Sequence, residues 1–284
     1  MSNAIRAFLN RIAEALERLA PPAVVAPRFD QARLFRFEPS PQERSADRFV
    51  AAPDYGLALD LLVGVERQKG QFVENLRRFA DGLPSNHALL WGSRGAGKSS
   101  LAKAGFMAVG AGFAALRMVE IDRDDIAALP RLFEDLRGRA ERFVVLCDDL
   151  SFEEGATAAK SLKSALEGGV AGPPGNVIFV ATSNRRHLMP RHHDERGDPM
   201  ANAEDAEEEV SVSDRFGLWI GFPPMDQPAY LAAVHAYAAR FDLEVEGLER
   251  RALQWSQRRG ARSGRVAWQF IRGLAGELGK PLPL

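Results

Sequence analysis

The sequence predicts an α/β protein in which a mostly parallel sheet lies between two layers of helices, followed by a small all-helical domain. Two observations predict this architecture. Short apolar runs typical of buried strands alternate with amphipathic helical stretches from about residue 60 to 222, and after Pro223-Pro224 the helical pattern continues alone. A chain of 284 residues is long enough for both parts.

The chain begins with a helical pattern over residues 4–20, which ends at Pro21-Pro22. Its apolar face either packs on this domain or a neighbouring one, or binds a partner or a membrane surface. Residues 21–57 are rich in proline and charge and contain a strand-like piece at 33–37. We therefore expect residues 1–57 to form a helix followed by an extended arm or a small accessory region.

Residues 58–222 contain the alternating pattern. The helices are expected at 66–80, 98–109, 125–138 and 154–167, and the strands at 88–91, 114–121, 143–148, 176–182 and 217–222. Residues 223–284 are expected to fold as a lid with helices at 227–240, 246–258 and 263–277. Between the last two strands, residues 189–212 are polar, acidic and without periodicity, which is typical of a functional or a disordered loop.

A complete G-x-x-x-x-G-K-[ST] motif follows the strand at 88–91 and opens the next helix. Glycines in such a loop let backbone N–H groups surround phosphates at the start of a helix, where the helix dipole favours anions. We expect Lys98 to reach the β- and γ-phosphates and the Ser99 hydroxyl to bind Mg²⁺. The expected nucleotide contacts in this segment are Gly92, Ser93, Arg94, Gly95, Ala96, Gly97, Lys98, Ser99 and Ser100.

Two carboxylates follow the apolar strand at 143–148. Asp148 is placed to hold Mg²⁺, directly or through water, and Asp149 to orient or deprotonate an attacking water. The next strand ends in Ser183-Asn184, and Asn184 is the candidate for positioning that water between the metal acid and the γ-phosphate. The sequence thus predicts Mg²⁺-dependent binding of a nucleoside triphosphate.

The composition limits which classes of partner and which cell compartment we expect. The net charge of −1 indicates no general affinity for nucleic acid, although local basic spots remain at Arg185-Arg186 and Arg258-Arg259. The single cysteine, Cys147, is expected in the core and excludes an intramolecular disulfide framework. No apolar run is long enough to span a bilayer and no secretory signal is recognisable, so we expect a cytoplasmic protein.

The histidines of the polar insertion, at positions 187, 192 and 193, have no cysteine or carboxylate at a recognised zinc spacing. We therefore expect no metal site there. The acidic stretch 194–209 would repel nucleic acid; it either engages a basic partner or is a solvated loop.

The order of these motifs resembles that of the AAA+ ATPases over roughly residues 60–280. The resemblance is closest to a family of bacterial AAA+ ATP-binding proteins with no assigned function. It rests on four segments: Leu90-Trp91-Gly92, Cys147-Asp-Asp-Leu-Ser-Phe-Glu153, Ala181-Thr-Ser-Asn-Arg-Arg-His-Leu188 and Ser213-Asp-Arg-Phe-Gly-Leu-Trp219. The Asp148-Asp149 pair looks like that of replication initiators, and Asp214–Gly217 is similar to the arginine-finger box of the Holliday-junction branch-migration motor.

The resemblance implies ATP and Mg²⁺ as ligands and gives further residues a role. Asn184 would be the first sensor, and Arg215 an arginine finger that reaches the γ-phosphate of a neighbouring subunit. Arg265 would be the sensor arginine of the lid, and Arg262 is the alternative candidate for that role. The turn Val63-Gly64-Val65 would border the adenine. Asp149 is one methylene shorter than the Glu that is usual at this position in the family. Either Glu153 or Glu154 would therefore assist it, or hydrolysis would be slow.

Three functions remain open at this level. The first is an oligomeric ATPase that remodels a protein or nucleic-acid partner, the second an ATP-gated switch or adaptor with little turnover, and the third a loader acting on DNA. Threading of a protein chain is disfavoured, because the segment Asp122-Arg123-Asp124-Asp125 after the second strand is acidic and lacks an aromatic residue. The sequence favours the oligomeric ATPase with an arginine finger supplied between subunits, and leaves the partner unidentified.

Overall fold

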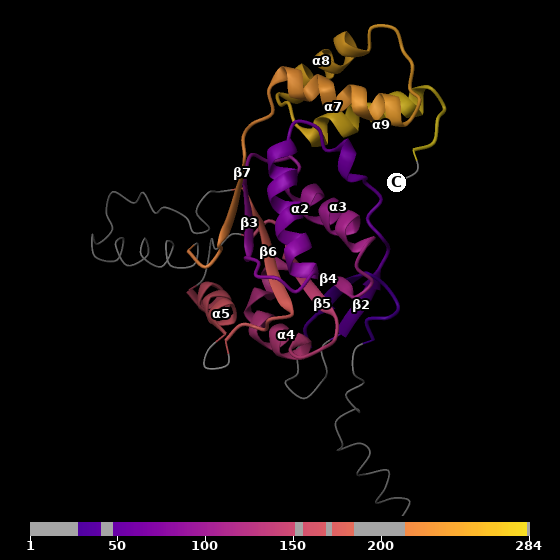
Figure 1. Ribbon diagram of the computed structural model, residues 1–284. Helices are drawn as coiled ribbons and strands as arrows, with labels where there is room; N and C mark the ends of the chain where they lie inside the picture. The colour runs from indigo at the N-terminus through magenta and orange to yellow at the C-terminus, as the bar shows by residue number, and fades with distance from the viewer. Residues whose placement is uncertain (1–27, 41–47, 151–155, 169–171, 185–213, 283–284) are drawn as a thin grey trace, which may run out of the picture.

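A computed structural model describes residues 28–40, 48–150, 156–168, 172–184 and 214–282 (Figure 1). Its centre is a seven-stranded sheet with the order β2-β1-β4-β5-β6-β3-β7. Neighbouring strands are parallel except for β1 and β2, which are antiparallel. The strands are β1 (Leu34–Glu38), β2 (Arg48–Ala52), β3 (Ala88–Gly92), β4 (Leu116–Ile121), β5 (Arg142–Cys147), β6 (Val177–Ser183) and β7 (Leu218–Phe222).

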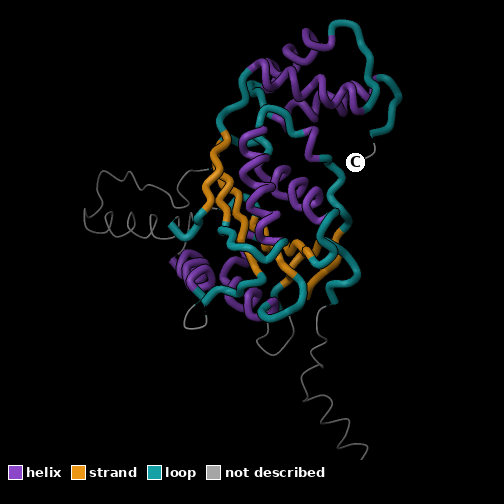
Figure 2. Tube along the Cα trace, in the orientation of Figure 1, coloured by secondary structure: helices purple, strands orange, loops and turns teal. Residues whose placement is uncertain are grey.

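Helices cover both faces of the sheet, which confirms the predicted three-layer α/β architecture (Figures 1 and 2). One face is covered by α2 (Glu66–Ala80) and α3 (Lys98–Gly110), and the other by α4 (Leu129–Leu136) and α5 (Ala156–Glu167). The short 3₁₀ helices η1 (Leu59–Leu61) and η2 (Arg123–Ala128) connect these elements.

The C-terminal helices form a separate all-helical unit at one end of the sheet (Figure 1). They are α7 (Gln227–Arg240), α8 (Leu248–Arg259) and α9 (Gly264–Glu277), and they close over an apolar core of their own. Leu57 packs against both this core and the core under α2 and α3. This unit is the helical lid that the sequence predicts.

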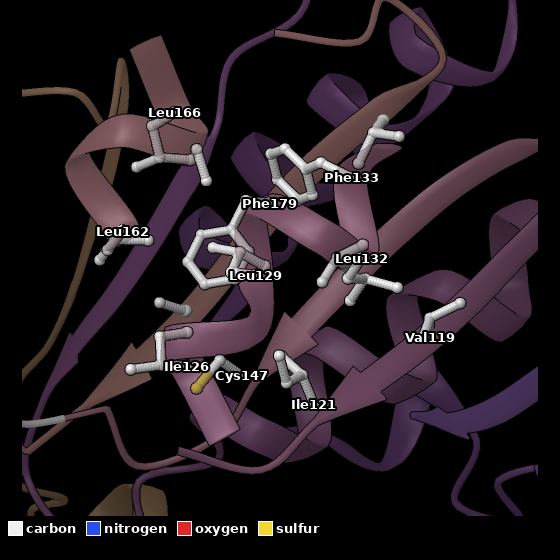
Figure 3. Packing of buried hydrophobic residues seen from close by; sticks show 14 of the residues in the cluster. Val119, Ile121, Ile126, Leu129, Leu132, Phe133, Cys147, Leu162, Leu166 and Phe179 are labelled. Carbon is white, nitrogen blue, oxygen red and sulfur yellow. The ribbon is translucent and has the colours of Figure 1, made fainter. Parts of the chain in front are cut away.

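The core between the sheet and the helices α4 and α5 is made of aliphatic and aromatic side chains (Figure 3). Val119 and Ile121 of β4 point toward Leu129 and Leu132, and Phe179 of β6 lies near Phe133. Cys147 is buried among them, as predicted, and burial raises the pKa of its thiol. Apolar burial on both faces explains why the central strands read as continuous apolar runs.

The structure differs from the sequence expectation in two places. Residues 34–52 do not form an arm outside the α/β unit: β1 pairs with β4 in parallel, and β2 closes that edge of the sheet. The helix expected at 125–138 is split into η2 and a shorter α4 that begins at Leu129. Pro130 explains the break, because proline is tolerated in the first turn of an α-helix but not inside it.

Some expectations fall on residues that the structure does not describe. They are the helix at 4–20, Glu153 and Glu154, the basic pair Arg185-Arg186, the three histidines from His187 to His193, and the polar loop 189–212.

Candidate functional site

The phosphate loop lies where β3 ends and α3 begins, at the end of the sheet that faces the lid (Figure 1). All three glycines of the loop have backbone angles that other residues rarely adopt, with φ of 127° at Gly92, 70° at Gly95 and 96° at Gly97. A Cβ at Gly92 would lie only 2.1 Å from the carbonyl oxygen of Phe222, so the close approach of β7 also requires glycine there. Arg94 is exposed at the tip of the loop, and Ala96 is buried beneath it.

Lys98 is held inside the loop by three acceptors. Its Nζ donates to the carbonyl oxygens of Gly92 and Ser93, each at 2.8 Å, and to Oδ1 of Asn184 at 3.0 Å. Burial lowers the pKa of Lys98, while the nearby carboxylates of Asp149 and Asp148 act in the opposite direction. Because the bonded acceptors are neutral, the ammonium charge remains available to phosphate oxygens.

Asp148, at the carboxyl end of β5, accepts two hydroxyl hydrogen bonds at one oxygen. Ser99 Oγ and Thr182 Oγ1 each lie 2.5 Å from its Oδ1. The serine hydroxyl and the carboxylate together offer the oxygen ligands that Mg²⁺ prefers. Ser99 and Asp148 thus fit the predicted metal site.

Asp149 follows in a left-handed conformation, with φ of 55°. Its backbone N–H donates to Thr182 Oγ1 at 2.9 Å, and its side chain accepts a hydrogen bond from Asn184 Nδ2. The guanidinium of Arg123, which follows β4, lies 3.7 Å from its other oxygen. The carboxylate of Asp149 is therefore held between the ends of two strands, β4 and β6, that flank β5.

The lid contacts the phosphate loop directly. The backbone N–H of Gly264, at the start of α9, donates to the carbonyl oxygen of Gly95 at 3.0 Å. The charges of Arg265 and Arg94 both lower the pKa of Lys98. A Cβ at Gly95 would lie 3.4 Å from Cβ of Arg265, so this lid residue borders the phosphate loop.

The turn Val63-Gly64-Val65 lies between the loop and the lid. Gly64 has a φ of 81°, and a Cβ there would be 3.2 Å from Cβ of Ala229 in α7. Leu62 is next to this turn. A Cβ at Gly97 would lie 3.8 Å from Cδ2 of Leu62. The turn thus borders both the phosphate loop and the lid. This is the position expected of a segment that borders the adenine.

Arg215 lies at the opposite end of the sheet. It precedes β7, and the register of β7 puts Phe222, not Arg215, beside Gly92 of the phosphate loop. The guanidinium of Arg215 forms an ion pair with Glu167 at the end of α5, in which Nε donates to Oε1 at 3.0 Å. The structure therefore brings together every other predicted catalytic residue but keeps Arg215 apart from its own chain's phosphate loop.

Three residues of this site were missed by the sequence analysis. Thr182 connects the two aspartates, and its only signal is a polar residue within an apolar strand. Arg123 pairs with Asp149. Tyr55 places its hydroxyl 3.3 Å from Ser100 Oγ and affects the pKa of Tyr237 in the lid, a contact that sequence spacing gave no reason to expect.

Within the described residues, no cluster of His, Cys, Asp and Glu suits a further metal ion. No helix in that part of the chain is long and apolar enough to cross a membrane.

Two solved structures of other proteins are similar to this one. The structure is similar to that of the Aeropyrum pernix Orc1 protein in complex with DNA, with a TM-score of 0.57 and 16% identity over 80% of this chain. The match spans 61% of the Orc1 chain. A match to the Thermotoga maritima RuvB Holliday junction branch migration motor has a TM-score of 0.47 and 16% identity, over 79% of this chain and 85% of that one.

No curated protein matches the chain. The parallel sheet, the phosphate loop and the helical C-terminal unit make this the P-loop NTPase fold of the AAA+ type. One protein family, described as a protein of unknown function (DUF815), matches residues 30–278. The chain therefore belongs to the DUF815 family, and its fold is that of an AAA+ protein.

Proposed function

We propose that this protein is a Mg²⁺-dependent ATPase that works as an oligomer and uses hydrolysis to remodel a protein or nucleic-acid partner. The observation that carries the proposal is the network at the end of the sheet, in which Lys98, Asn184 and Asp149 are joined by hydrogen bonds. Those groups suit the binding of phosphates and the orientation of a water molecule.

The chemical roles follow from this geometry. Lys98 and the N–H groups of the first turn of α3 bind phosphate oxygens, since these N–H groups have no acceptor within the helix. A bound Mg²⁺ would neutralise charge on the phosphates, with Ser99 and Asp148 as its protein ligands. Asn184 holds the carboxylate of Asp149, which accepts a proton from the attacking water or orients it.

Arg215 supports the oligomeric part of the proposal. The strand Leu218–Phe222 lies between Arg215 and the phosphate loop, which Phe222 adjoins, and this strand alone spans about 13 Å. An arginine side chain cannot reach across that distance to its own chain's nucleotide. If Arg215 acts on a γ-phosphate, that nucleotide belongs to a neighbouring subunit, and head-to-tail contacts of this kind build rings or helical filaments.

A second candidate is an ATP-gated switch. The hydrogen bond from Gly264 to Gly95 supports it, because the lid would respond to any change in the phosphate loop on nucleotide binding. The short side chain of Asp149 also agrees with slow turnover. A DNA loader is the third candidate and predicts salt-sensitive binding to DNA.

The decisive experiment measures ATP turnover against protein concentration for the wild type and for Arg215→Ala. We expect specific activity to rise with concentration in the wild type and to fall by about a thousandfold in the variant, with ATP affinity unchanged. Because Arg215 is paired with Glu167, a thermal unfolding measurement of the variant separates a loss of catalysis from a loss of stability.

Other outcomes select other functions. Turnover that depends on neither concentration nor Arg215 contradicts the oligomeric model. ATP binding without turnover at any concentration identifies the switch.

A further inference from the structure

A depression lies at the end of the sheet opposite the phosphate loop, beside the amino ends of β3, β5 and β6. Its volume is about 360 Å³, and it opens to solvent. Phe79 at the end of α2, Leu83, Pro173 and Pro174 form its apolar walls, while Arg142 and His87 supply polar groups. We call it the amino-end groove. The predicted nucleotide site uses none of these residues.

Arg142 is a partly buried cation without a carboxylate partner in the described chain. Its guanidinium carbon lies 5.1 Å from the centre of the Phe79 ring, and Nη1 is 3.5 Å from the carbonyl oxygen of Gly175. Several other partly buried arginines are paired with carboxylates: Arg33 with Asp54, Arg137 with Glu134 and Arg215 with Glu167. Arg117 instead uses its guanidinium on three backbone carbonyls, whereas Arg142 donates to only one among the described residues. Arg142 therefore keeps N–H groups and a full charge available to an anion that enters the groove.

His87 adds a neutral donor to the same groove. Its Nδ1 accepts a hydrogen bond from the backbone N–H of Phe179 at 3.0 Å, so the ring proton is assigned to Nε2. Burial lowers the pKa of His87 to about 4, and the ring is neutral at pH 7. Among the described residues, Nε2 has no hydrogen-bond acceptor of its own.

The groove thus combines a guanidinium, an N–H donor and apolar walls. A carboxylate matches the planar guanidinium fork, with His87 as a further donor, whereas a free phosphate leaves the apolar walls without a partner. The rim favours a protein segment over a small molecule. Leu83 is 56% exposed there and adjoins the exposed rings of Pro84 and Pro173, and a contiguous apolar surface of this kind suits a peptide side chain better than a small polar anion.

We propose that the amino-end groove binds a protein segment in which the carboxylate of an acidic residue adjoins an apolar side chain. Arg142 and Nε2–H of His87 donate to the carboxylate, and the apolar side chain packs against Phe79 and Leu83. The groove and the phosphate loop lie at opposite ends of β3 and β6, so both ligands fit at once. The proposal does not depend on ATP hydrolysis.

The test uses the full-length chain and a panel of fluorescent tetrapeptides, acetylated and amidated, in which a single Glu precedes or follows Leu, Phe or Pro. The matched panel replaces Glu with Gln. We expect Glu peptides to bind about tenfold more tightly than their Gln counterparts by fluorescence anisotropy, because their hydrogen bonds to Arg142 are charge-assisted. Arg142→Gln removes this difference.

Two control variants make the result specific. Arg77→Gln removes the same charge from the last turn of α2, at an exposed side chain outside the groove, and leaves binding unchanged. Leu83→Gln changes an exposed residue without affecting folding and weakens binding of every peptide in the panel. This variant keeps the test valid if Arg142→Gln fails to fold.

Three outcomes overturn the proposal. They are no binding by any Glu peptide, equal binding of Glu and Gln peptides, and binding that survives Arg142→Gln. If free 4-methylpentanoate binds as tightly as the peptides, the groove is a site for small acids and not for a protein. Since none of these measurements uses ATP, they succeed or fail independently of the ATPase proposal.

Discussion

The two ends of the sheet are built in different ways. At the carboxyl end, hydrogen bonds join Lys98 to Asn184 and Asn184 to Asp149, so that side chains from neighbouring strands form one network. At the amino end, Arg215 pairs with Glu167 while Arg142, on another strand, has no carboxylate partner in the described chain. A substitution in the carboxyl-end network should therefore disturb several side chains of the site together. Substitutions at the amino end should act independently of one another.

The largest expected effect on nucleotide binding is at the carboxyl end. In Lys98→Ala, we expect affinity for Mg²⁺ and a non-hydrolysable ATP analogue to fall by at least about a hundredfold, because the ammonium makes charge-assisted bonds to phosphates. Calorimetric titration measures this, with Lys160→Ala on the exposed side of α5 as the matched control. Unchanged affinity would show that the loop does not bind the phosphates. The amino-end groove should keep its peptide affinity in this variant.

His87→Gln tests the amino end through stability. In the unfolded chain the imidazole takes up a proton near pH 6.5, but in the folded chain only near pH 4. The unfolded state thus binds more protons in this window, and the wild type loses up to about 3 kcal/mol of stability as the pH falls from 6.5 to 4. Gln still offers an oxygen to the N–H of Phe179 but does not titrate.

Urea unfolding of both proteins at pH 8 and at pH 4.5 measures this contribution. The wild type should lose more stability than His87→Gln between these two pH values. Equal losses would show that the ring of His87 is accessible to protons in the folded state.

The smallest effect is expected from Arg123→Gln. Arg123 and Asp149 are about half exposed and 3.7 Å apart, so solvent screens their ion pair. Release of the carboxylate should raise ATP turnover about two- to fivefold without a change in ATP affinity. Steady-state kinetics measure both, and Arg123→Lys, which keeps the charge, serves as the control. A drop in turnover would mean that Arg123 supports Asp149 instead of competing for it.

Local sequence patterns correctly predicted the features that are formed by contiguous residues. The loop Gly92–Ser99, the strand before Asp148-Asp149 and the lid helices were all predicted near their observed positions, because glycine spacing and apolar periodicity are properties of single segments. The network among Lys98, Asn184 and Asp149 could also be anticipated, since parallel strands end at one edge of the sheet. Thr182 and Arg123 were missed, because neither belongs to a local motif and only the pairing of the strands brings them to the aspartates.

Whether a feature could be predicted depended on how far apart its residues lie along the chain. The sequence determined the fold class, the phosphate loop and the pair of acids, all of which are coded over short distances along the chain. Tertiary structure decided that β1 and β2 extend the sheet, and that Arg215 faces away from its own phosphate loop. It also brought His87, Arg142 and Pro173 to one groove, because the side-by-side order of strands is set by packing across the whole sheet.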